Sequence, residues 1–209
     1  MIRATFFFLV TGVMLAQTSL QSDLVKAAES GDAKKVRELL DAGAKPQLPK
    51  TFSALQAAAA GAFPDVVREM LRKPVDLRQR DSAGRTALHV VGTTAVGAAR
   101  DNIARVARML IANGADVNAR DHIHGNTLLH EVPDADTAKV LLDAGARLNI
   151  ANKDGQTPLM LTLDEDIARL LVNAGADVSL RDNNGKTALD LARELQLTEK
   201  IAVLERRSK

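Results

Sequence analysis

The sequence has no cysteine, no tryptophan and no tyrosine, and it has only five phenylalanines. A chain without cysteine has no disulfide framework, no thiolate nucleophile and no cysteine-ligated zinc. Proteins that bind RNA or single strands on a sheet stack the bases on aromatic side chains, and antibody-like sandwiches use a core tryptophan. Three of the five phenylalanines stand together at Phe6, Phe7 and Phe8. The rest of the chain therefore lacks the side chains that these classes need.

A strong net charge is also missing. The 28 basic and 26 acidic residues give +2 at pH 7, which is too little for a non-specific nucleic-acid binder. The length of 209 residues, with 46% apolar and 26% charged residues, is typical of one soluble domain. Charge is nevertheless uneven, because residues 65–120 carry ten basic and six acidic groups and residues 121–180 carry four and ten. This unevenness is either an ordinary solvated surface or a device that steers a two-signed partner.

The amino terminus has the pattern of an export signal. Arg3 precedes thirteen uncharged residues, Ala4 to Ala16, and this predicts a signal peptide at 1–16, cut after Ala16 or as late as residue 22. Thirteen residues are fewer than the roughly 20 that span a bilayer, so an uncleaved membrane anchor is the alternative. Because the chain has no cysteine and no Asn-x-Ser/Thr sequon, a bacterial periplasm or secretion is the expected destination.

Two phrases recur along the rest of the chain at intervals of about 30 residues, which indicates a repeat array. The phrase Gly-Ala-Asp-Val-Asn at 114–118 returns in related form from Gly145 and Gly175. The phrase Gly-x-Thr-x-Leu starts at four positions, which are Gly84, Gly125, Gly155 and Gly185. A weaker copy, Ser-Ala-Leu-Gln, stands at 53–56. Together these phrases resemble ankyrin repeats over about residues 22–205.

The resemblance implies an all-α repeat solenoid of about six units, each a helix-turn-helix with a hairpin loop. The expected domain covers 22–209, with units at about 22–50, 51–80, 81–120, 121–150, 151–180 and 181–209. Threonines of the second phrase are expected to act as N-caps, namely Thr86, Thr127, Thr157 and Thr187. Second helices are predicted at 103–112, 136–143 and 166–172, each ended by a left-handed glycine.

Several departures from the family pattern lead to further expectations. The units at 121–150 and 151–180 are shorter between their helices, which predicts a shortened turn. An insertion at 93–102 is either a longer loop or extra helical turn, or a binding element. The loop from Asn118 to Gly125 has one extra residue, which is expected to push His122, Ile123 and His124 outward. In the last unit, four residues are expected to face inward, namely Leu191, Leu195, Ile201 and Leu204.

Candidate chemistry is sparse in this sequence. His89 and His130 end the Thr-x-Leu-His phrase, so the resemblance implies a structural role within the loop framework. His122 and His124, with Asp121, are possible ligands for Zn²⁺ or Cu²⁺, but no third histidine lies near in sequence. No nucleophile elbow, phosphate loop or zinc-protease helix is present. The sequence therefore predicts no enzyme, no cofactor and no metal.

The resemblance implies a scaffold that binds a protein partner through its concave face and loop tips. We expect a monomer in the periplasm that binds another periplasmic protein, and not nucleic acid, and inhibits or protects it. An immunity factor for a cell-wall enzyme is one form, and support of a catalase is another. The alternatives are a metal-binding or weakly catalytic protein built on His122 and His124, or a membrane-anchored adaptor. The family's variable positions, at which we expect the partner contacts, correspond to Ser82, Ala83, Arg85, Arg120, His122, Ile123, Asn126, Asn152, Lys153, Gln156, Asn183, Asn184 and Lys186. His124, in the longer loop, is a further predicted contact.

Overall fold

The structure is a computed structural model that describes residues 17–47, 53–95 and 100–207. The predicted signal peptide at 1–16 lies outside these residues. The helices come in consecutive pairs, except in unit 81–120, which has one helix after a run of turns at 87–94. They are a first helix over 17–29, α2 (Ala33–Asp41), α3 (Ala54–Ala60), α4 (Pro64–Leu71), α5 (Arg100–Ala112), η1 (Leu128–His130), α6 (Ala135–Asp143), α7 (Pro158–Leu161), α8 (Glu165–Asn173), α9 (Ala188–Glu194) and α10 (Thr198–Arg207).

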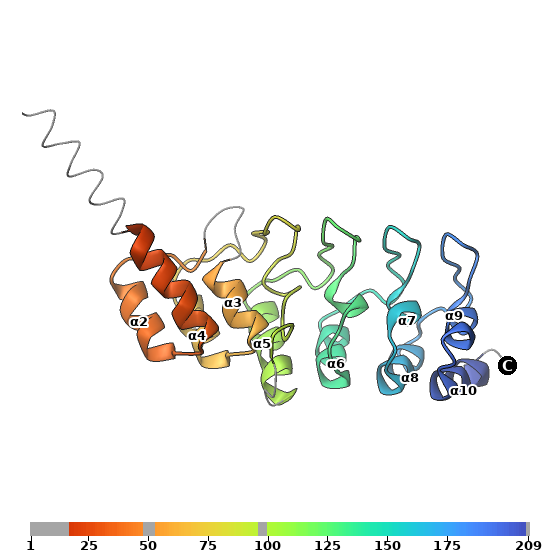
Figure 1. Ribbon diagram of the computed structural model, residues 1–209. Coiled ribbons are helices and arrows are strands. Elements are labelled where there is room, and N and C mark those ends of the chain that lie inside the picture. The colour runs from red at the N-terminus through yellow and green to blue at the C-terminus, as the bar shows by residue number, and fades with distance from the viewer. Residues whose placement is uncertain (1–16, 48–52, 96–99, 208–209) are drawn as a thin grey trace, which may run out of the picture.

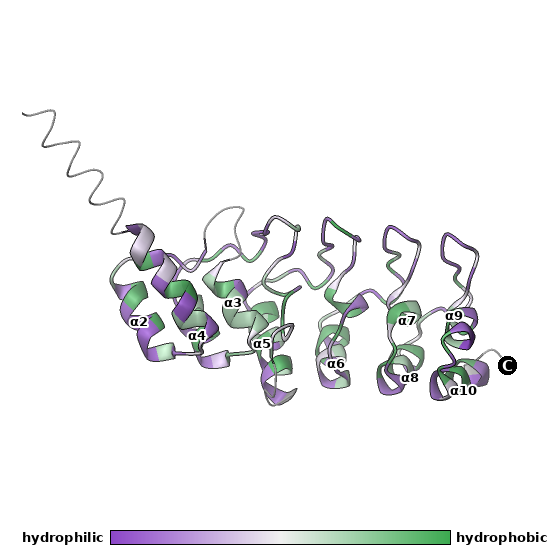
Figure 2. Cartoon of the chain, in the orientation of Figure 1, coloured by the Kyte–Doolittle hydropathy of each residue, from purple (hydrophilic) through white to green (hydrophobic). Residues whose placement is uncertain are grey.

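The pairs stand side by side in an elongated array, with the hairpin loops projecting from one side (Figure 1). The second helices stack in the order α2, α4, α5, α6, α8 and α10. The buried side chains of the first and second helices form one continuous core, which includes Leu24, Met70, Leu110, Leu141 and Leu171. The apolar residues concentrate in the helices, whereas the loops are mainly hydrophilic (Figure 2). Since the described residues contain no strand, the predicted all-α solenoid is confirmed.

The second helices match their predicted bounds to within three residues, and the glycines that follow them have positive φ angles. Gly114, Gly145 and Gly175 have φ of 96°, 83° and 99°, which an L side chain adopts only with strain. Helix α5 starts three residues earlier than predicted, so residues 100–102 of the insertion add to this helix. Residues 96–99 of the insertion lie outside the described part of the chain.

The first element of a unit is often not a full helix, which corrects the prediction of a short helix after each threonine. Residues 87–94 form consecutive turns, η1 is a single 3₁₀ turn, and α7 has four residues. In contrast, α9 has seven residues. The shorter spacing within units 121–150 and 151–180 thus shortens the first helix, and not only the turn.

The predicted threonine N-caps occur at Thr127, Thr157 and Thr187, and each forms a capping box with the residue three positions later. The Thr187 hydroxyl accepts the N–H of Asp190 at 3.2 Å. In the units of Thr86, Thr127 and Thr157, the N–H three residues after the threonine also donates to the threonine carbonyl, at 3.0 to 3.1 Å. These i to i+3 bonds are those of a tight 3₁₀-type turn, which the first element of each of these units begins with.

The array begins earlier than the predicted unit boundary at 22. The first helix is already formed at residue 17, and Leu24 on it is fully buried. The Gln21 side chain donates to the Lys45 carbonyl at 2.7 Å and accepts the Lys45 N–H at 3.1 Å. These contacts make residues 20–22 part of the folded domain.

The last unit departs from expectation at two positions. Leu204 is fully buried and Leu191 and Ile201 are half-buried, as predicted. Leu195 was expected to face inward but is 59% exposed, because it is the C-cap of α9 and lies at the turn. Lys200 is 2% exposed and was not anticipated. Its Nζ donates to the carbonyls of Met160 and Thr162 at 3.2 and 2.7 Å, and burial lowers its pKa to about 8.

Candidate protein-binding surface at the hairpin tips

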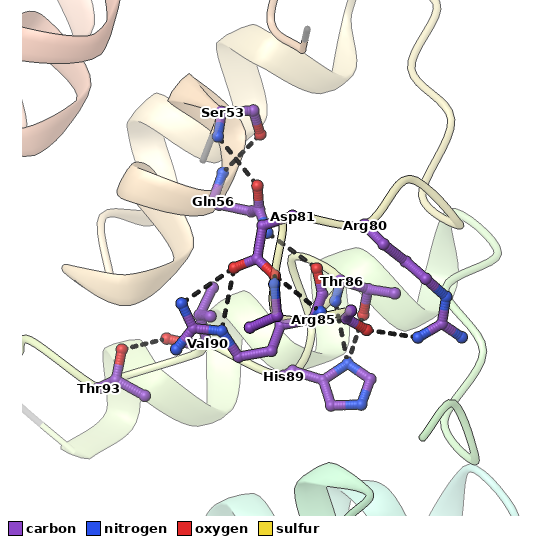
Figure 3. Close-up of polar contacts among 11 residues, drawn as sticks. Ser53, Gln56, Arg80, Asp81, Arg85, Thr86, His89, Val90 and Thr93 are labelled. Atoms are coloured by element: carbon purple, nitrogen blue, oxygen red, sulfur yellow. Dashed lines mark hydrogen bonds and ion pairs between the residues drawn. The ribbon is translucent and has the colours of Figure 1, made fainter. Parts of the chain in front are cut away.

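Four hairpin tips stand in a row above the helices. We number them by unit: tip 3 (81–85), tip 4 (121–126), tip 5 (152–156) and tip 6 (182–186). Each tip folds around the side chain of its first residue, and in tip 3 an Asp81 oxygen accepts the N–H groups of Ala83 and Arg85 at 2.9 Å (Figure 3). Asn152 and Asp182 do the same in tips 5 and 6. Asp and Asn favour such turns, because their side chains accept nearby backbone N–H groups that would otherwise bond within a helix or sheet.

Tip 4 is the longest, and Asp121 holds it. The carboxylate accepts the N–H groups of Ile123, His124, Gly125 and Asn126 at 2.6, 2.7, 3.3 and 2.8 Å. Burial opposes ionisation of Asp121, but the four N–H donors outweigh it and lower the pKa. The carboxylate is therefore fully used within the tip.

The possible metal site at tip 4 gains no support from this geometry. Asp121 is committed to backbone donors, and within the part of the chain that is described no three His, Cys, Asp or Glu side chains gather as a metal site. A catalytic zinc needs three protein ligands held rigidly.

The tips are joined to one another through backbone hydrogen bonds. His122 N–H donates to the Ala83 carbonyl at 3.0 Å, Lys153 N–H donates to the His124 carbonyl at 2.8 Å, and Asn183 N–H donates to the Asp154 carbonyl at 3.0 Å. The contact between tips 3 and 4 requires glycine, since a Cβ on Gly84, at φ 76°, would lie 2.1 Å from the His122 ring. Tips 3 to 6 thus form one continuous ridge.

Three cationic side chains donate hydrogen bonds to backbone carbonyls in or beside tip 4. Arg80 Nη1 donates to the carbonyls of Gly84 and Arg120. Arg120 donates to the carbonyls of Gly125 and Ala151 at 2.9 and 2.7 Å, and Lys153 Nζ donates to those of His122 and Ile123. Among the described residues, none of the three forms an ion pair with a carboxylate. Their positive charges therefore have no contacting counter-charge.

The side chains at the end of tip 4 are exposed, as expected. Ile123 is 57% exposed, and His122 and His124 are also exposed. Ser82, Arg120, Lys153, Asn183 and Asn184 are exposed as well, whereas Ala83, Gln156, Arg85 and Lys186 are half-buried.

Two of the half-buried residues are already paired. Arg85 contacts Asp81 at 2.9 Å and Lys186 contacts Glu194 at 2.7 Å. Each of these positive charges is therefore partly neutralised within the chain.

Two predicted contact residues belong to the framework instead. Asn126 and Asn152 are 6% and 7% exposed. Asn152 Nδ2 donates to Asn126 Oδ1 at 3.0 Å, and Asn126 Nδ2 donates to Glu131 Oε1 at 2.6 Å. Their side chains are used to join tips 4 and 5, which removes them from the exposed surface.

The structural role of the two phrase histidines is confirmed. Nδ1 of His130 accepts the Thr127 N–H at 3.1 Å, so Nε2 carries the proton and donates to the Ile150 carbonyl at 3.0 Å. Nδ1 of His89 accepts the Thr86 N–H in the same way (Figure 3), although Nε2 of His89 has no partner with hydrogen-bond geometry. Burial lowers the pKa of both rings.

Sequence reasoning missed Arg80, although a signal for it exists. An arginine directly precedes the tip aspartate in three of the four tips, at Arg80, Arg120 and Arg181. Each donates to the carbonyl of the glycine in its own tip. The repetition of this pair indicates a common bracing role.

The family model for ankyrin repeats matches at residues 24–121, 95–179 and 130–204. The chain belongs to the ankyrin repeat family. Among curated ankyrin relatives, a putative ankyrin repeat protein of fowlpox virus is 37% identical over 110 residues, which is 51% of this chain and 31% of that protein. A probable E3 ubiquitin-protein ligase of rice, Oryza sativa subsp. japonica, is 33% identical over 51% of this chain and 20% of its own length. The chain thus spans less than a third of these relatives.

A solved ankyrin-like structure matches over a larger share. One chain of the complex between a predatory endopeptidase from Bdellovibrio bacteriovorus and an immunity protein superposes with a TM-score of 0.76. Its sequence is 29% identical, and the match covers 88% of this chain and 97% of that chain.

In residues 17–47, 53–95 and 100–207, no helix combines the length and the apolar character needed to cross a membrane.

Proposed function

We propose that this ankyrin protein is exported and inhibits an endopeptidase in the same compartment, as an immunity protein. The observation that carries the proposal is the match over 97% of one chain of an endopeptidase–immunity protein complex. We take that chain to be the immunity protein, because 97% of it superposes on this all-helical ankyrin array. Ankyrin arrays bind other proteins, and their fold alone does not select the partner.

The polar groups of tip 4 and the two phrase histidines support a binding role. Asp121 is saturated by four backbone N–H groups, and the pKa of His89 and of His130 is lowered by burial. A general base needs a free lone pair that reaches a substrate, whereas these groups spend theirs on the loop framework. The inhibition that we propose is therefore steric, with the rigid ridge of tips covering the enzyme.

Export is supported by the sequence and is compatible with the fold. The basic and apolar pattern of residues 1–16 is that of a signal peptide. A cut after Ala16 leaves the helix at 17–29, with its buried Leu24 and the bonds of Gln21 to Lys45, intact. A cut at residue 22 removes Gln21 from the domain, so we propose the earlier site and a periplasmic location.

The test combines capture with an activity assay. The chain is crosslinked in intact cells, the partner is identified, and the intact mass of the mature chain is measured. We expect a mature start near Gln17 and an endopeptidase as the partner. Its hydrolysis of a peptide substrate should fall close to zero at one equivalent of the mature chain.

An unrelated ankyrin array of similar length serves as the control in the same assay. Full hydrolysis at tenfold excess of the mature chain, or a full-length chain in the cytoplasm, refutes the proposal. A captured catalase whose activity rises would establish the protective form instead.

A further inference from the structure

We infer that tip 4 is the element that enters the partner, and that the partner presents an apolar pocket rimmed by carboxylates. This deepens the proposed function, on which the choice of an endopeptidase rests. The shape and charge of tip 4 are observations on this chain alone.

The first observation is an exposed apolar side chain on a rigid support. The large exposed hydrophobic residues in the described part of the chain are Ile123, Leu163 and Leu195, and only Ile123 lies on a tip. The Ile123 N–H donates to Asp121 at 2.6 Å, and the Ile123 carbonyl accepts from Lys153 Nζ at 3.0 Å. A residue whose backbone is held in place before binding loses little backbone entropy on association, so its exposed side chain serves well as an anchor.

The second observation is the uncompensated charge around this anchor. Arg80, Arg120 and Lys153 donate only to backbone carbonyls near tip 4. The carboxylate inside the tip, Asp121, is buried and bonded to N–H groups. The neighbouring Asp154 is exposed and lies beyond ion-pair distance of all three cations. Carboxylates on the partner are the groups that complement such a ring of cations.

The charges of the chain around tip 4 further restrict which partners can bind. Arg80 and Arg120 belong to residues 65–120, which carry ten basic and six acidic groups, whereas residues 121–180 carry four basic and ten acidic groups, so tip 4 lies where the positive half of the array meets its negative half. A partner that is acidic over a broad area is repelled by this half, and like-charge contacts suppress wrong partners. The fitting partner therefore has its carboxylates concentrated around one apolar pocket.

Because Arg85 forms an ion pair within the chain, other cations are assigned to the contact with the partner. Arg85 was a predicted contact, but its guanidinium contacts Asp81 at 2.9 Å. Arg80 and Lys153 have no such partner among the described residues. We therefore assign the electrostatic contact to Arg80, Arg120 and Lys153, and not to Arg85.

The first arm of the test maps the contact in intact cells. A photo-crosslinking amino acid is placed at position 123 or, as a matched control, at position 163, where Leu163 is 66% exposed in the turn between α7 and α8. We expect a crosslinked complex from position 123 and none from position 163. The crosslinked peptide of the partner should lie beside aspartate or glutamate residues.

The second arm measures binding kinetics with the captured protein in purified form. Ile123→Ala should speed dissociation roughly 30-fold, as for a central anchor, whereas Leu163→Ala should leave the rate unchanged. Lys153→Gln keeps a donor but removes the charge, so we expect it to slow association about threefold in 50 mM salt and to have no effect in 500 mM salt. Lys139→Gln, on the exposed side of α6, is the charge control.

The outcomes separate this inference from the proposed function. Crosslinking from position 163 alone, or parental kinetics for both Ile123→Ala and Lys153→Gln, overturns the inference even if an endopeptidase is inhibited. Crosslinking from position 123 to an acidic-rimmed protein that is not a peptidase supports the inference and refutes the proposed function. Circular dichroism and thermal unfolding of each variant establish that a loss of binding is not a loss of fold.

Discussion

The helix pairs and the hairpin tips belong to the same repeats, yet different forces hold them. The helices bury an apolar core in which Leu110, Leu141 and Leu171 are fully buried. The tips have no such core and depend on buried carboxylates or amides that accept backbone N–H groups, as Asp121 does. Burial of apolar area is non-directional, whereas a hydrogen bond requires its geometry. The helices therefore supply stability, and the tips supply the fixed shape that recognition needs.

The largest effect should follow from a cavity among the helices. Leu141→Ala removes a fully buried side chain from α6 and should lower the free energy of unfolding by about 2 to 5 kcal/mol. Urea denaturation followed by circular dichroism measures it. Leu163→Ala, at a 66% exposed position, should change it by less than about 0.5 kcal/mol. If the two variants unfold alike, the helices are not the main source of stability.

The buried cation Lys200 gives a second test of how the helices contribute to stability. The pKa of Lys200 is lowered by burial from 10.5 to about 8, so between these values the unfolded chain binds the additional proton. Stability should therefore rise with pH through this window, by about 3 kcal/mol. The absence of tyrosine and cysteine leaves lysines as the side chains that titrate there.

Lys200→Gln keeps donors for the carbonyls of Met160 and Thr162 but removes the titration. Unfolding free energies measured from pH 7.5 to 10.5 should rise in the parent and stay nearly level in this variant. Lys139→Gln should behave like the parent. A parallel rise in Lys200→Gln would assign the effect to other groups.

In the tips, the largest effect should come from Asp121. Asp121→Ala leaves four backbone N–H groups without their acceptor and should cost about 1 to 3 kcal/mol. Asp121→Asn keeps one acceptor oxygen and should cost less. Amide hydrogen exchange should accelerate at residues 123–126 while the amides of α6 keep their protection. Equal acceleration in α6 would show that tips and helices unfold as one unit.

The smallest effect concerns the histidine that joins the tips to the helices. Burial lowers the pKa of His130 below 6.5 in the folded state, so the unfolded state binds the proton more readily. Stability should be complete above pH 6.5 and should fall as the pH drops below it. His130→Gln should weaken this dependence in thermal unfolding between pH 7.5 and 5. His124→Gln, at an exposed tip position, should leave it unchanged.

The sequence predicted the parts of the fold that depend on repetition. Recurring glycines and apolar spacing located α5, α6 and α8 to within three residues, because each glycine must follow its helix in a left-handed conformation. The threonine N-caps at Thr127, Thr157 and Thr187 were predicted, but the shortness of η1 and α7 was not, because only tertiary packing decides between a 3₁₀ turn and an α-turn. Lys200 could not be found, since a lysine near the end of a cap unit is usually solvated.

The candidate surface was predicted in part. One extra residue in tip 4 was enough to predict the exposure of His122, Ile123 and His124, because length alone extends a hairpin. Burial of Asn126 and Asn152 was not predictable, since both occupy variable positions whose contacts lie one unit away. The pairing of Arg85 depends on the same kind of information, namely on how a tip folds around its own aspartate.

The bonds between neighbouring tips have a consequence for how such a protein evolves. They run from backbone to backbone, from His122 to Ala83, from Lys153 to His124 and from Asn183 to Asp154. A mutation at an outward position such as Ile123 or Asn184 therefore leaves these backbone bonds in place, and under the binding role that we propose it changes the contact with the partner without altering the frame. Specificity and stability therefore depend on different residues. A gene duplicate can acquire a new target by substitutions at the ridge alone, and a library randomised there samples binders on an unchanged scaffold.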